Sequence, residues 1–344
     1  MFRVGITPDF YVDAKGRFER GLEDGLAGRT GIEAVPMPPQ PGKLGPPEAL
    51  DQFDAVFSLA LKITPESLRG VERLAVVARW GVGYDMIDVD ALTDAGIALA
   101  ITPQAVRRPV AEAIFTFIFA LGKNLKALDR MTRAGGWRGG MDHLSRNFDT
   151  QTLGSIGCGN IAREMFRMGR AFGFRRLLAC DPHVQPDSIG DLGIELTDMD
   201  TVLRESDFVT VNTYLNASTL GLIGERELRL MKPTAFLINT ARGPIVREDA
   251  LVRALEEKWI AGAGTDVFEQ EPPRADHPLF RLENVIVTPH GLAWTEDLMY
   301  GNAVEACENV LAVSRGETPR GIVNRAVLDS PVFQNKLARY RSRQ

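Results

Sequence analysis

The sequence has few cysteines, few histidines and no long hydrophobic run. It contains 3 cysteines and 4 histidines among 344 residues. An odd number of cysteines without metal-ligand spacing favours apolar packing in a reducing cytoplasm over a disulfide framework or a zinc site. The most apolar run, residues 113–121, is too short to span a bilayer and is more typical of a buried helix. We therefore expect a cytoplasmic protein with no metal site and no membrane segment.

The sequence also lacks an excess of positive charge, a secretion signal and a repeat. The 40 basic residues are outnumbered by 45 acidic ones, and the net charge of -5 argues against a nucleic-acid-binding face. The first residues, 1–9, resemble a first strand and not a charged segment followed by a long apolar one. A composition of 44% hydrophobic and 25% charged residues predicts a globular protein, long enough for about two domains.

Short apolar segments alternate with helical patterns along most of the chain, which is typical of α/β proteins with parallel sheets. Candidate strands before residue 102 are 2–7, 55–59, 74–78 and 97–101. Later candidates are 153–156, 177–180, 208–211, 235–238, 261–265 and 285–288. This second set, joined by helical crossovers, predicts a doubly wound dinucleotide-binding domain. A proline-rich stretch, 36–47, predicts an irregular surface excursion.

A glycine-rich turn follows the strand candidate 153–156. Gly157 is suited to a tight turn, and Gly159 would let the backbone approach a pyrophosphate. The helix beginning at Asn160 and Ile161 would offer free N–H groups to that anion. Asp181 comes roughly 20 residues later, as expected of an acid that binds the adenosine ribose. Because a carboxylate there repels the 2′-phosphate of NADP, the motif predicts NAD; the alternative is an ordinary tight turn.

A second glycine-rich turn, Gly81-Val82-Gly83, follows the strand candidate 74–78. Two glycines this close together leave backbone N–H groups uncovered, which suits a carboxylate or a phosphate. A simple strand-to-helix turn that needs positive φ explains the same residues equally well.

A long apolar helix is expected within residues 102–135. It begins near Arg107-Arg108-Pro109, with Pro109 at an acceptable first-turn position. The helix and the glycine-bearing loop that follows it, residues 134–140, are predicted to connect two domains. Trp137 in this loop is expected to pack against the protein or to contact another subunit.

Three polar residues lie just past predicted strands, where open α/β sheets bind their ligands: Arg242, Glu271 and His290. Arginine offers a planar fork for a 2-keto carboxylate, and histidine is suited to donate and accept a proton near neutral pH. A carboxylate such as Glu271 would stabilise the protonated imidazole and fix its tautomer. The remaining histidines lie elsewhere: His143 in a polar loop, His183 after the ribose-binding strand, and His277 before Pro278 in a surface turn. Spacing alone leaves a structural role for His290 open.

Taken in order, these motifs resemble the D-isomer-specific 2-hydroxyacid dehydrogenase family over nearly the whole chain. The matching segments are 79–85, 110–112, the glycine-rich turn at 157–159, 239–244, 262–268, 288–290 and 323–324. The resemblance implies an α/β protein with two Rossmann-like domains. One is a discontinuous, flavodoxin-like substrate domain, residues 1–101 and 296–344, and the other is a doubly wound NAD-binding domain, residues 102–295.

The resemblance also implies a role for each site residue. Arg242 would bind the substrate carboxylate and carbonyl, and His290 would be the acid/base with Glu271 as its partner. Backbone N–H groups of Val82 and Gly83 would hold the carboxylate, and Asp266 with the main chain at Thr240 and Ala241 would hold the nicotinamide. The family further implies D stereochemistry, a small-molecule 2-keto or 2-hydroxy acid bound in a cleft between the domains, and usually a homodimer through the dinucleotide domains.

Several positions depart from the usual family pattern. Ile101 replaces a common asparagine, Asn212 replaces a common histidine, and residues 291–295 differ from the usual segment after the catalytic histidine. Four residues stand where substrate selectivity would be set: Trp80, Trp294, Arg107 and Arg108. The two arginines are open to two interpretations, a solvated first turn or a site for a second carboxylate or phosphate.

Two other functions are compatible with the same fold. An NAD(H)-sensing, corepressor-like binding protein would bind the cofactor with little turnover. A formate dehydrogenase is disfavoured by Glu271, because the resemblance implies glutamine at this position in that branch of the family.

Overall fold

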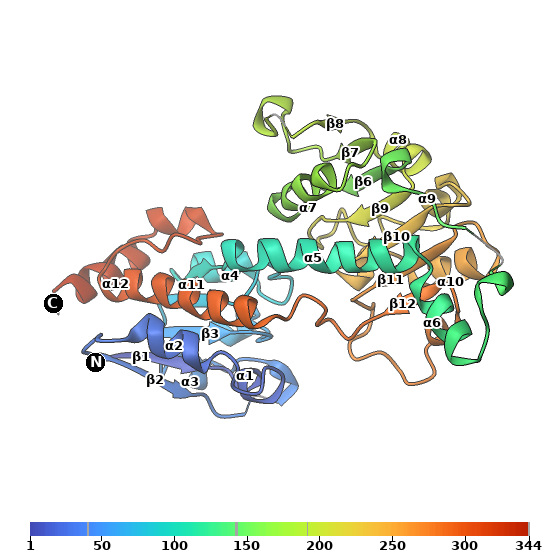
Figure 1. Ribbon diagram of the computed structural model, residues 1–344. Helices are drawn as coiled ribbons and strands as arrows, with labels where there is room; N and C mark the ends of the chain where they lie inside the picture. The colour runs from blue at the N-terminus through green and yellow to red at the C-terminus, as the bar shows by residue number, and fades with distance from the viewer. Residues whose placement is uncertain (40, 142–143, 191, 343–344) are drawn as a thin grey trace. The chain divides into compact units, whose positions relative to one another are not determined.

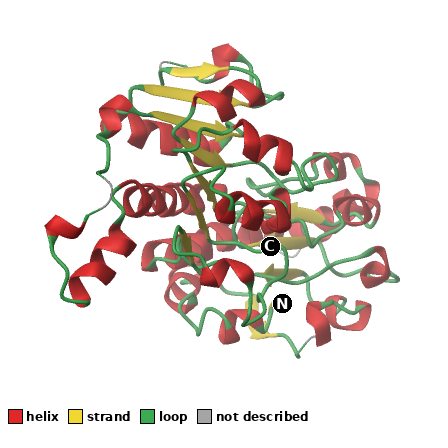
Figure 2. Ribbon diagram, turned by 90° about the vertical axis from the view of Figure 1, so that its right-hand side faces the viewer, coloured by secondary structure: helices red, strands yellow, loops and turns green. Residues whose placement is uncertain are grey.

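The computed structural model describes residues 1–39, 41–141, 144–190 and 192–342, and its chain divides into two compact units. Unit 1 consists of Met1–Val106 and Trp294–Gln344, and unit 2 consists of Arg107–Ala293. The first boundary falls within the long helix α5, Pro103–Gly122. His143 lies outside the described residues. Figure 2 shows helices, in red, packed alongside the yellow strands of the sheets.

Unit 1 is built on a parallel sheet with the strand order β2-β1-β3-β4-β5. Its strands are β1 (Phe2–Ile6), β2 (Ile32–Pro36), β3 (Ala55–Ser58), β4 (Val76–Arg79) and β5 (Ala98–Ala100). Its helices are α1 (Asp9–Val12), α2 (Glu19–Leu26), α3 (Pro47–Leu50), α4 (Val89–Asp94), α11 (Glu296–Ser314) and α12 (Pro331–Arg341). This order is the flavodoxin-like one, which confirms the predicted fold of the first domain.

Helix α12 is the red helix near the C-terminus in Figure 1, and buried polar side chains anchor it to unit 1. The Tyr340 hydroxyl donates to Asp54 Oδ1 at 3.0 Å, and Arg73 donates to Asp54 Oδ2 at 2.6 Å. Burial opposes the charged form of Asp54, but the hydrogen bonds and the Arg73 charge outweigh it and lower the pKa of the carboxyl. One turn away, Lys336 donates to three backbone carbonyls of the same unit. Helix α12 is therefore part of the folded core of unit 1.

Unit 2 is built on a larger parallel sheet with the strand order β12-β11-β10-β9-β6-β7-β8. Its strands are β6 (Thr152–Ile156), β7 (Arg176–Cys180), β8 (Ile194–Leu196), β9 (Phe208–Val211), β10 (Phe236–Asn239), β11 (Gly262–Thr265) and β12 (Val285–Val287). Besides α5, its α-helices are α6 (Leu125–Arg133), α7 (Asn160–Ala171), α8 (Met199–Glu205), α9 (Glu225–Leu230) and α10 (Glu248–Glu256). The order reverses between β6 and β9, as expected of a doubly wound dinucleotide-binding fold.

The register of this sheet aligns the ends of three neighbouring strands. Asn239 at the end of β10 pairs with Thr265 at the end of β11, and Thr265 pairs with Val287 at the end of β12. The loops that follow these strands therefore start level with one another on one edge of the sheet.

The structure adds two strands that the sequence patterns do not predict. Both β2 and β8 are edge strands that pair on one side alone. Their side chains are partly exposed, β8 has three residues, and β2 ends in Pro36. Short, half-exposed edge strands carry little of the apolar signal on which strand prediction depends.

The expected position of Pro109 in the first turn of its helix is wrong. Helix α5 begins at Pro103, so Pro109 lies in its interior. The N-terminus is set by a distant residue, because Glu305 of α11 accepts the backbone N–H groups of Gln104 and Ala105. Within the described part of the chain, no helix is long and apolar enough to cross a membrane.

Candidate active site

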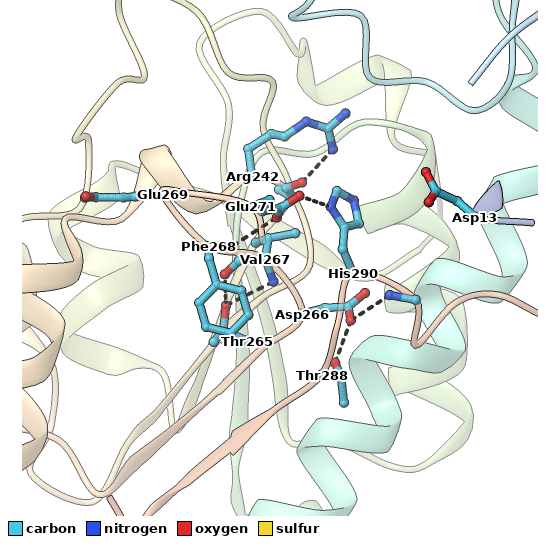
Figure 3. A network of polar contacts seen from close by, with 12 residues as sticks. Asp13, Arg242, Thr265, Asp266, Val267, Phe268, Glu269, Glu271, Thr288 and His290 are labelled. Atoms are coloured by element: carbon cyan, nitrogen blue, oxygen red, sulfur yellow. Dashed lines mark hydrogen bonds and ion pairs between the residues drawn. The ribbon is translucent and has the colours of Figure 1, made fainter. Parts of the chain in front are cut away.

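Three of the residues singled out by the sequence lie on the aligned loops of unit 2 (Figure 3). Arg242 follows β10, Glu271 follows β11 and His290 follows β12. Because their strands are adjacent and in register, positions far apart in the sequence lie along one short edge of the sheet.

Glu271 and His290 are in direct contact. Nδ1 of His290 lies 2.7 Å from Oε2 of Glu271, and both side chains are partly exposed, at 42% and 38%. The other carboxylate oxygen accepts the backbone N–H of Phe268 at 3.1 Å. Burial opposes ionisation of Glu271, but the hydrogen bond and charge of His290, the Phe268 amide and the charge of Arg242 together lower the pKa of its carboxyl. The carboxylate is thus charged and oriented beside the imidazole.

The backbone of His290 adopts an uncommon conformation, with φ of 52°. A non-glycine residue in the left-handed region costs on the order of 1 kcal/mol and persists where its surroundings enforce it. Asp266 supplies that constraint, since its buried carboxylate accepts the Thr288 hydroxyl and the backbone N–H groups of Gly291 and Leu292. The side chain of His290 is therefore held toward Glu271 by the loop on both sides of it.

The loop that carries Arg242 is held by Asn239 and packed against the loop of Glu271. Asn239 Nδ2 donates to the Arg242 carbonyl at 2.9 Å, and Asn239 Oδ1 accepts the Ala241 amide at 3.0 Å. Arg242 Nη1 donates to the Ala241 carbonyl at 2.8 Å. A Cβ at Gly243 would lie 1.9 Å from the Phe268 carbonyl carbon, so only glycine permits this close approach.

The dinucleotide turn has the geometry that its sequence predicts. Gly157 has φ of 99°, and a Cβ there would lie 2.3 Å from the Asn212 carbonyl oxygen. A Cβ at Gly159 would meet nothing within 4 Å among the described residues, so the space beside this backbone is open. Helix α7 begins at Asn160, and no side chain in the described ranges caps it, which leaves the N–H groups of Asn160 and Ile161 for an anion.

Asp181 lies beside that turn. One carboxylate oxygen accepts the Cys158 amide at 2.8 Å, and the other accepts the His183 amide at 2.9 Å. These bonds fix the carboxylate next to the glycines and leave further lone pairs for hydroxyl donors. The open turn, the uncapped helix and the fixed acid together fit a dinucleotide with an unphosphorylated ribose.

The second glycine-rich turn lies in unit 1, directly after β4. Gly81 has φ of 87°, and its N–H donates to Thr102 Oγ1 at 2.7 Å. Val82 and Gly83 follow it and are partly exposed. The Trp80 side chain is buried, with its ring against Phe10 at 4.6 Å, so it belongs to the core of unit 1.

Arg107 and Arg108 form ion pairs within unit 2. Both contact Glu164 of α7, at 3.8 and 3.4 Å, and Arg108 also contacts Glu112 at 2.6 Å. The double arginine therefore ties α5 to α7.

His277 lies at a turn, as predicted, since its N–H donates to the Arg274 carbonyl. Its side chain, however, is 11% exposed, and Nε2 lies 3.0 Å from Oε2 of Glu248. The two residues are far apart in the sequence, and no local pattern identifies the pair.

Comparisons with known proteins agree with this fold. Residues 115–291 match the family model described as D-isomer specific 2-hydroxyacid dehydrogenase, NAD binding domain. The chain is 35% identical over 290 residues to a glyoxylate reductase of Thermococcus litoralis, and the aligned region covers 82% of this chain and 87% of that relative. It is 38% identical over 293 residues to a glyoxylate reductase of Korarchaeum cryptofilum, covering 83% and 88%. A crystal structure of a glyoxylate reductase from Paecilomyes thermophila matches with a TM-score of 0.79 and 28% identity, covering 94% and 98%.

Proposed function

The chain belongs to the D-isomer specific 2-hydroxyacid dehydrogenase family and is an NAD-dependent enzyme, and on this premise we propose which residues act and on what substrate. The proposed reaction is the reduction of a small 2-keto acid to the D-2-hydroxy acid, and its reverse. Glyoxylate is the first candidate, because relatives that match most of this chain are glyoxylate reductases. The observation that carries the proposal is the contact between Glu271 and His290 on loops level with that of Arg242.

His290 is the proposed acid/base. A carboxylate can only accept hydrogen bonds, so Nδ1 of His290 carries the hydrogen that Glu271 receives. Nε2 then faces the substrate and gives a proton to the carbonyl oxygen, and Glu271 stabilises the imidazolium beforehand. When bound, NADH supplies the hydride to the keto carbon. Arg242 holds the substrate carboxylate through its planar fork and polarises the carbonyl.

The remaining residues are proposed to bind and orient the substrate and the cofactor. Val82 and Gly83 offer backbone N–H groups to the substrate carboxylate. The cofactor side has six further positions, in addition to Gly157 and Gly159: Asn160, Ile161, Asp181, Thr240, Ala241 and Asp266. The glycine turn and helix N-terminus hold the pyrophosphate, through Gly157, Gly159, Asn160 and Ile161, and Asp181 accepts the ribose hydroxyls. Thr240, Ala241 and Asp266 lie on the aligned loops and hold the nicotinamide end.

A panel of 2-keto acids tests the proposal. Purified protein should oxidise NADH with at least one of glyoxylate, hydroxypyruvate, pyruvate and phosphohydroxypyruvate. His290→Ala should reduce turnover by about 10²–10⁴-fold and keep its affinity for NADH, because general acid catalysis contributes that much. Tight NADH binding without reduction of any keto acid would contradict the proposal and would instead match a cofactor-sensing, corepressor-like protein.

We also propose that the protein is a cytoplasmic homodimer associated through unit 2. Large apolar side chains between α6 and β6 are exposed on the single chain, notably Trp137 at 71% and Leu144 at 86%. Large apolar side chains that cluster on a surface are typical of an interaction face, and these two lie close together in the sequence. Light scattering after gel filtration should give twice the chain mass, and Trp137→Glu should shift it toward the monomer; a monomeric parent protein would contradict this.

A further inference from the structure

Behind the Glu271 loop, the N-terminus of α10 and the segment after β11 exchange hydrogen bonds. The backbone N–H of Glu248 donates to the Glu269 carboxylate at 3.0 Å, and the backbone N–H of Glu269 donates to Oε1 of Glu248 at 2.8 Å. Glu269 thus accepts a helix N–H that has no partner within α10, and Glu248 fixes the backbone two residues before Glu271. Two segments distant in the sequence are locked together here.

His277 occupies the second oxygen of Glu248. Its Nδ1 accepts the Leu279 amide at 3.4 Å, so the ring hydrogen resides on Nε2 and is donated to Oε2 of Glu248 at 3.0 Å. Both side chains are largely buried, at 11% and 18% exposed, so the loss of a hydrogen-bond partner here costs more free energy than at the surface. Each oxygen of Glu248 therefore has one assigned donor.

The ring of His277 also packs against Phe268, with centroids 5.4 Å apart in an edge-to-face arrangement. Phe268 connects both halves of the candidate site. Its N–H donates to the Glu271 carboxylate, and its carbonyl lies against Gly243, next to Arg242. Figure 3 shows Phe268 and Glu271 on this one loop. A shift of Phe268 would displace Glu271 and press on the arginine loop.

We infer that His277 and Glu248 are positioning residues, which hold the Glu271 carboxylate against His290 through Phe268 and Glu269. The inference rests on the proposed function, because it assigns the pair to the catalytic hydrogen bond. Neither residue contacts Glu271 or His290 in the described hydrogen bonds. Their effect is on where the carboxylate lies. Small misplacements of catalytic groups can cost up to about 100-fold in rate.

Three variants separate positioning from general support of the fold. His277→Phe keeps a ring against Phe268 but removes both hydrogen bonds. His277→Gln keeps a donor for Glu248. Glu248→Gln leaves one oxygen for two donors, so one contact is lost. Asp249→Asn is the matched control, because it makes the same charge change one residue along the first turn of α10, where Asp249 is exposed and paired with Arg247.

The first measurement is steady-state turnover of the folded full-length protein at a temperature well below unfolding. His277→Phe and Glu248→Gln should lower kcat about tenfold or more, with KM for NADH within about twofold of the parent. His277→Gln should restore most of kcat, and Asp249→Asn should match the parent. Parent-like kcat in both His277→Phe and Glu248→Gln would overturn the inference.

The second measurement does not depend on turnover. The chain has 4 histidines, so proton and ¹⁵N NMR of labelled imidazoles can identify the Nδ1 hydrogen that His290 shares with Glu271, by its loss in His290→Ala. This signal should move or broaden in His277→Phe and Glu248→Gln and recover in His277→Gln. An unchanged signal in both overturns the inference, whatever the activity. A displaced signal in a protein that reduces no keto acid keeps the inference and refutes the proposed function; should His277→Phe not fold, Glu248→Gln carries the test.

Discussion

Replacing Glu271 by glutamine gives the sharpest test of the proposed acid/base pair. Glutamine keeps one oxygen that can accept the Nδ1 hydrogen of His290, while its NH2 group cannot accept the Phe268 N–H. The substitution therefore removes the negative charge and one backbone hydrogen bond. Because the pKa of Glu271 is lowered in the folded protein, its carboxylate is charged throughout any ordinary assay range. The substitution therefore changes the charge beside the imidazole at every pH measured.

The magnitude follows from the geometry of the pair. A hydrogen bond to a charged group contributes about 1.5–3 kcal/mol. Both side chains are partly exposed, at 42% and 38%, and solvent screening favours the lower end of that range. About 1.4 kcal/mol of transition-state stabilisation corresponds to a tenfold change in rate. We therefore expect kcat/KM for carbonyl reduction to fall about tenfold in Glu271→Gln.

Carbonyl reduction needs the imidazolium that the Glu271 charge stabilises, so kcat/KM for reduction should fall about tenfold while the Kd for NADH stays near the parent value. Asp276→Asn, an exposed acid paired with Arg274, is the charge control and should change neither quantity. Glu271→Gln with parent-like kcat/KM for reduction would refute the pairing as the source of acid/base strength.

Three further changes test other parts of the molecule. Arg242→Lys keeps the positive charge but loses the planar guanidinium, so KM for the keto acid should rise about tenfold or more. The Kd for NADH, measured by fluorescence, should stay constant. An unchanged KM would exclude Arg242 from substrate binding. Asp181→Ser removes the carboxylate expected to repel the 2′-phosphate of NADPH. The ratio of kcat/KM with NADPH to kcat/KM with NADH should therefore rise at least about tenfold. A constant ratio would contradict the role of Asp181. Asp54→Asn should lower the free energy of unfolding by about 1.5–3 kcal/mol at pH 7, because the negative charge is lost and one oxygen cannot accept Arg73, Tyr340 and the Arg3 N–H as two carboxylate oxygens do. Folding lowers the pKa of Asp54, so the parent should keep its extra free energy of unfolding above the ordinary carboxyl pKa and lose it as pH falls through the pKa of the folded protein. Urea unfolding at several pH values measures this difference. A difference between parent and variant that persists in acid would refute the assignment.

Much of the fold follows from the sequence because its central strands are strongly apolar. Strands such as β6, β9 and β10 are buried on both faces, and runs of this kind between glycine-rich turns are recognisable without a structure. The edge strands β2 and β8 lack that signal, because their side chains are partly exposed. The start of α5 differs from the prediction because Glu305, which accepts its first N–H groups, comes from a helix distant in the sequence.

The candidate site is likewise predictable from the sequence only in part. Arg242, Glu271 and His290 can be singled out because each follows a recognisable strand, and parallel strands bring their ends to one edge. The residues behind them give no such signal. His277 looks like part of a surface turn until the fold brings it to Glu248, and Trp80, which the family pattern places near the substrate, is buried in the core of unit 1. Such contacts depend on loop conformations that local patterns do not determine.

The left-handed backbone of His290 explains why a buried acid is needed at position 266. Without support, a loop would relieve a positive φ at a non-glycine residue, and the imidazole would turn away from Glu271. Asp266 prevents this by accepting hydrogen bonds from Thr288, Gly291 and Leu292, on both sides of the strained residue. The conformational cost is thus met when the protein folds and not when substrate arrives. Preorganisation of this kind favours catalysis, because the proton donor needs no reordering during the reaction.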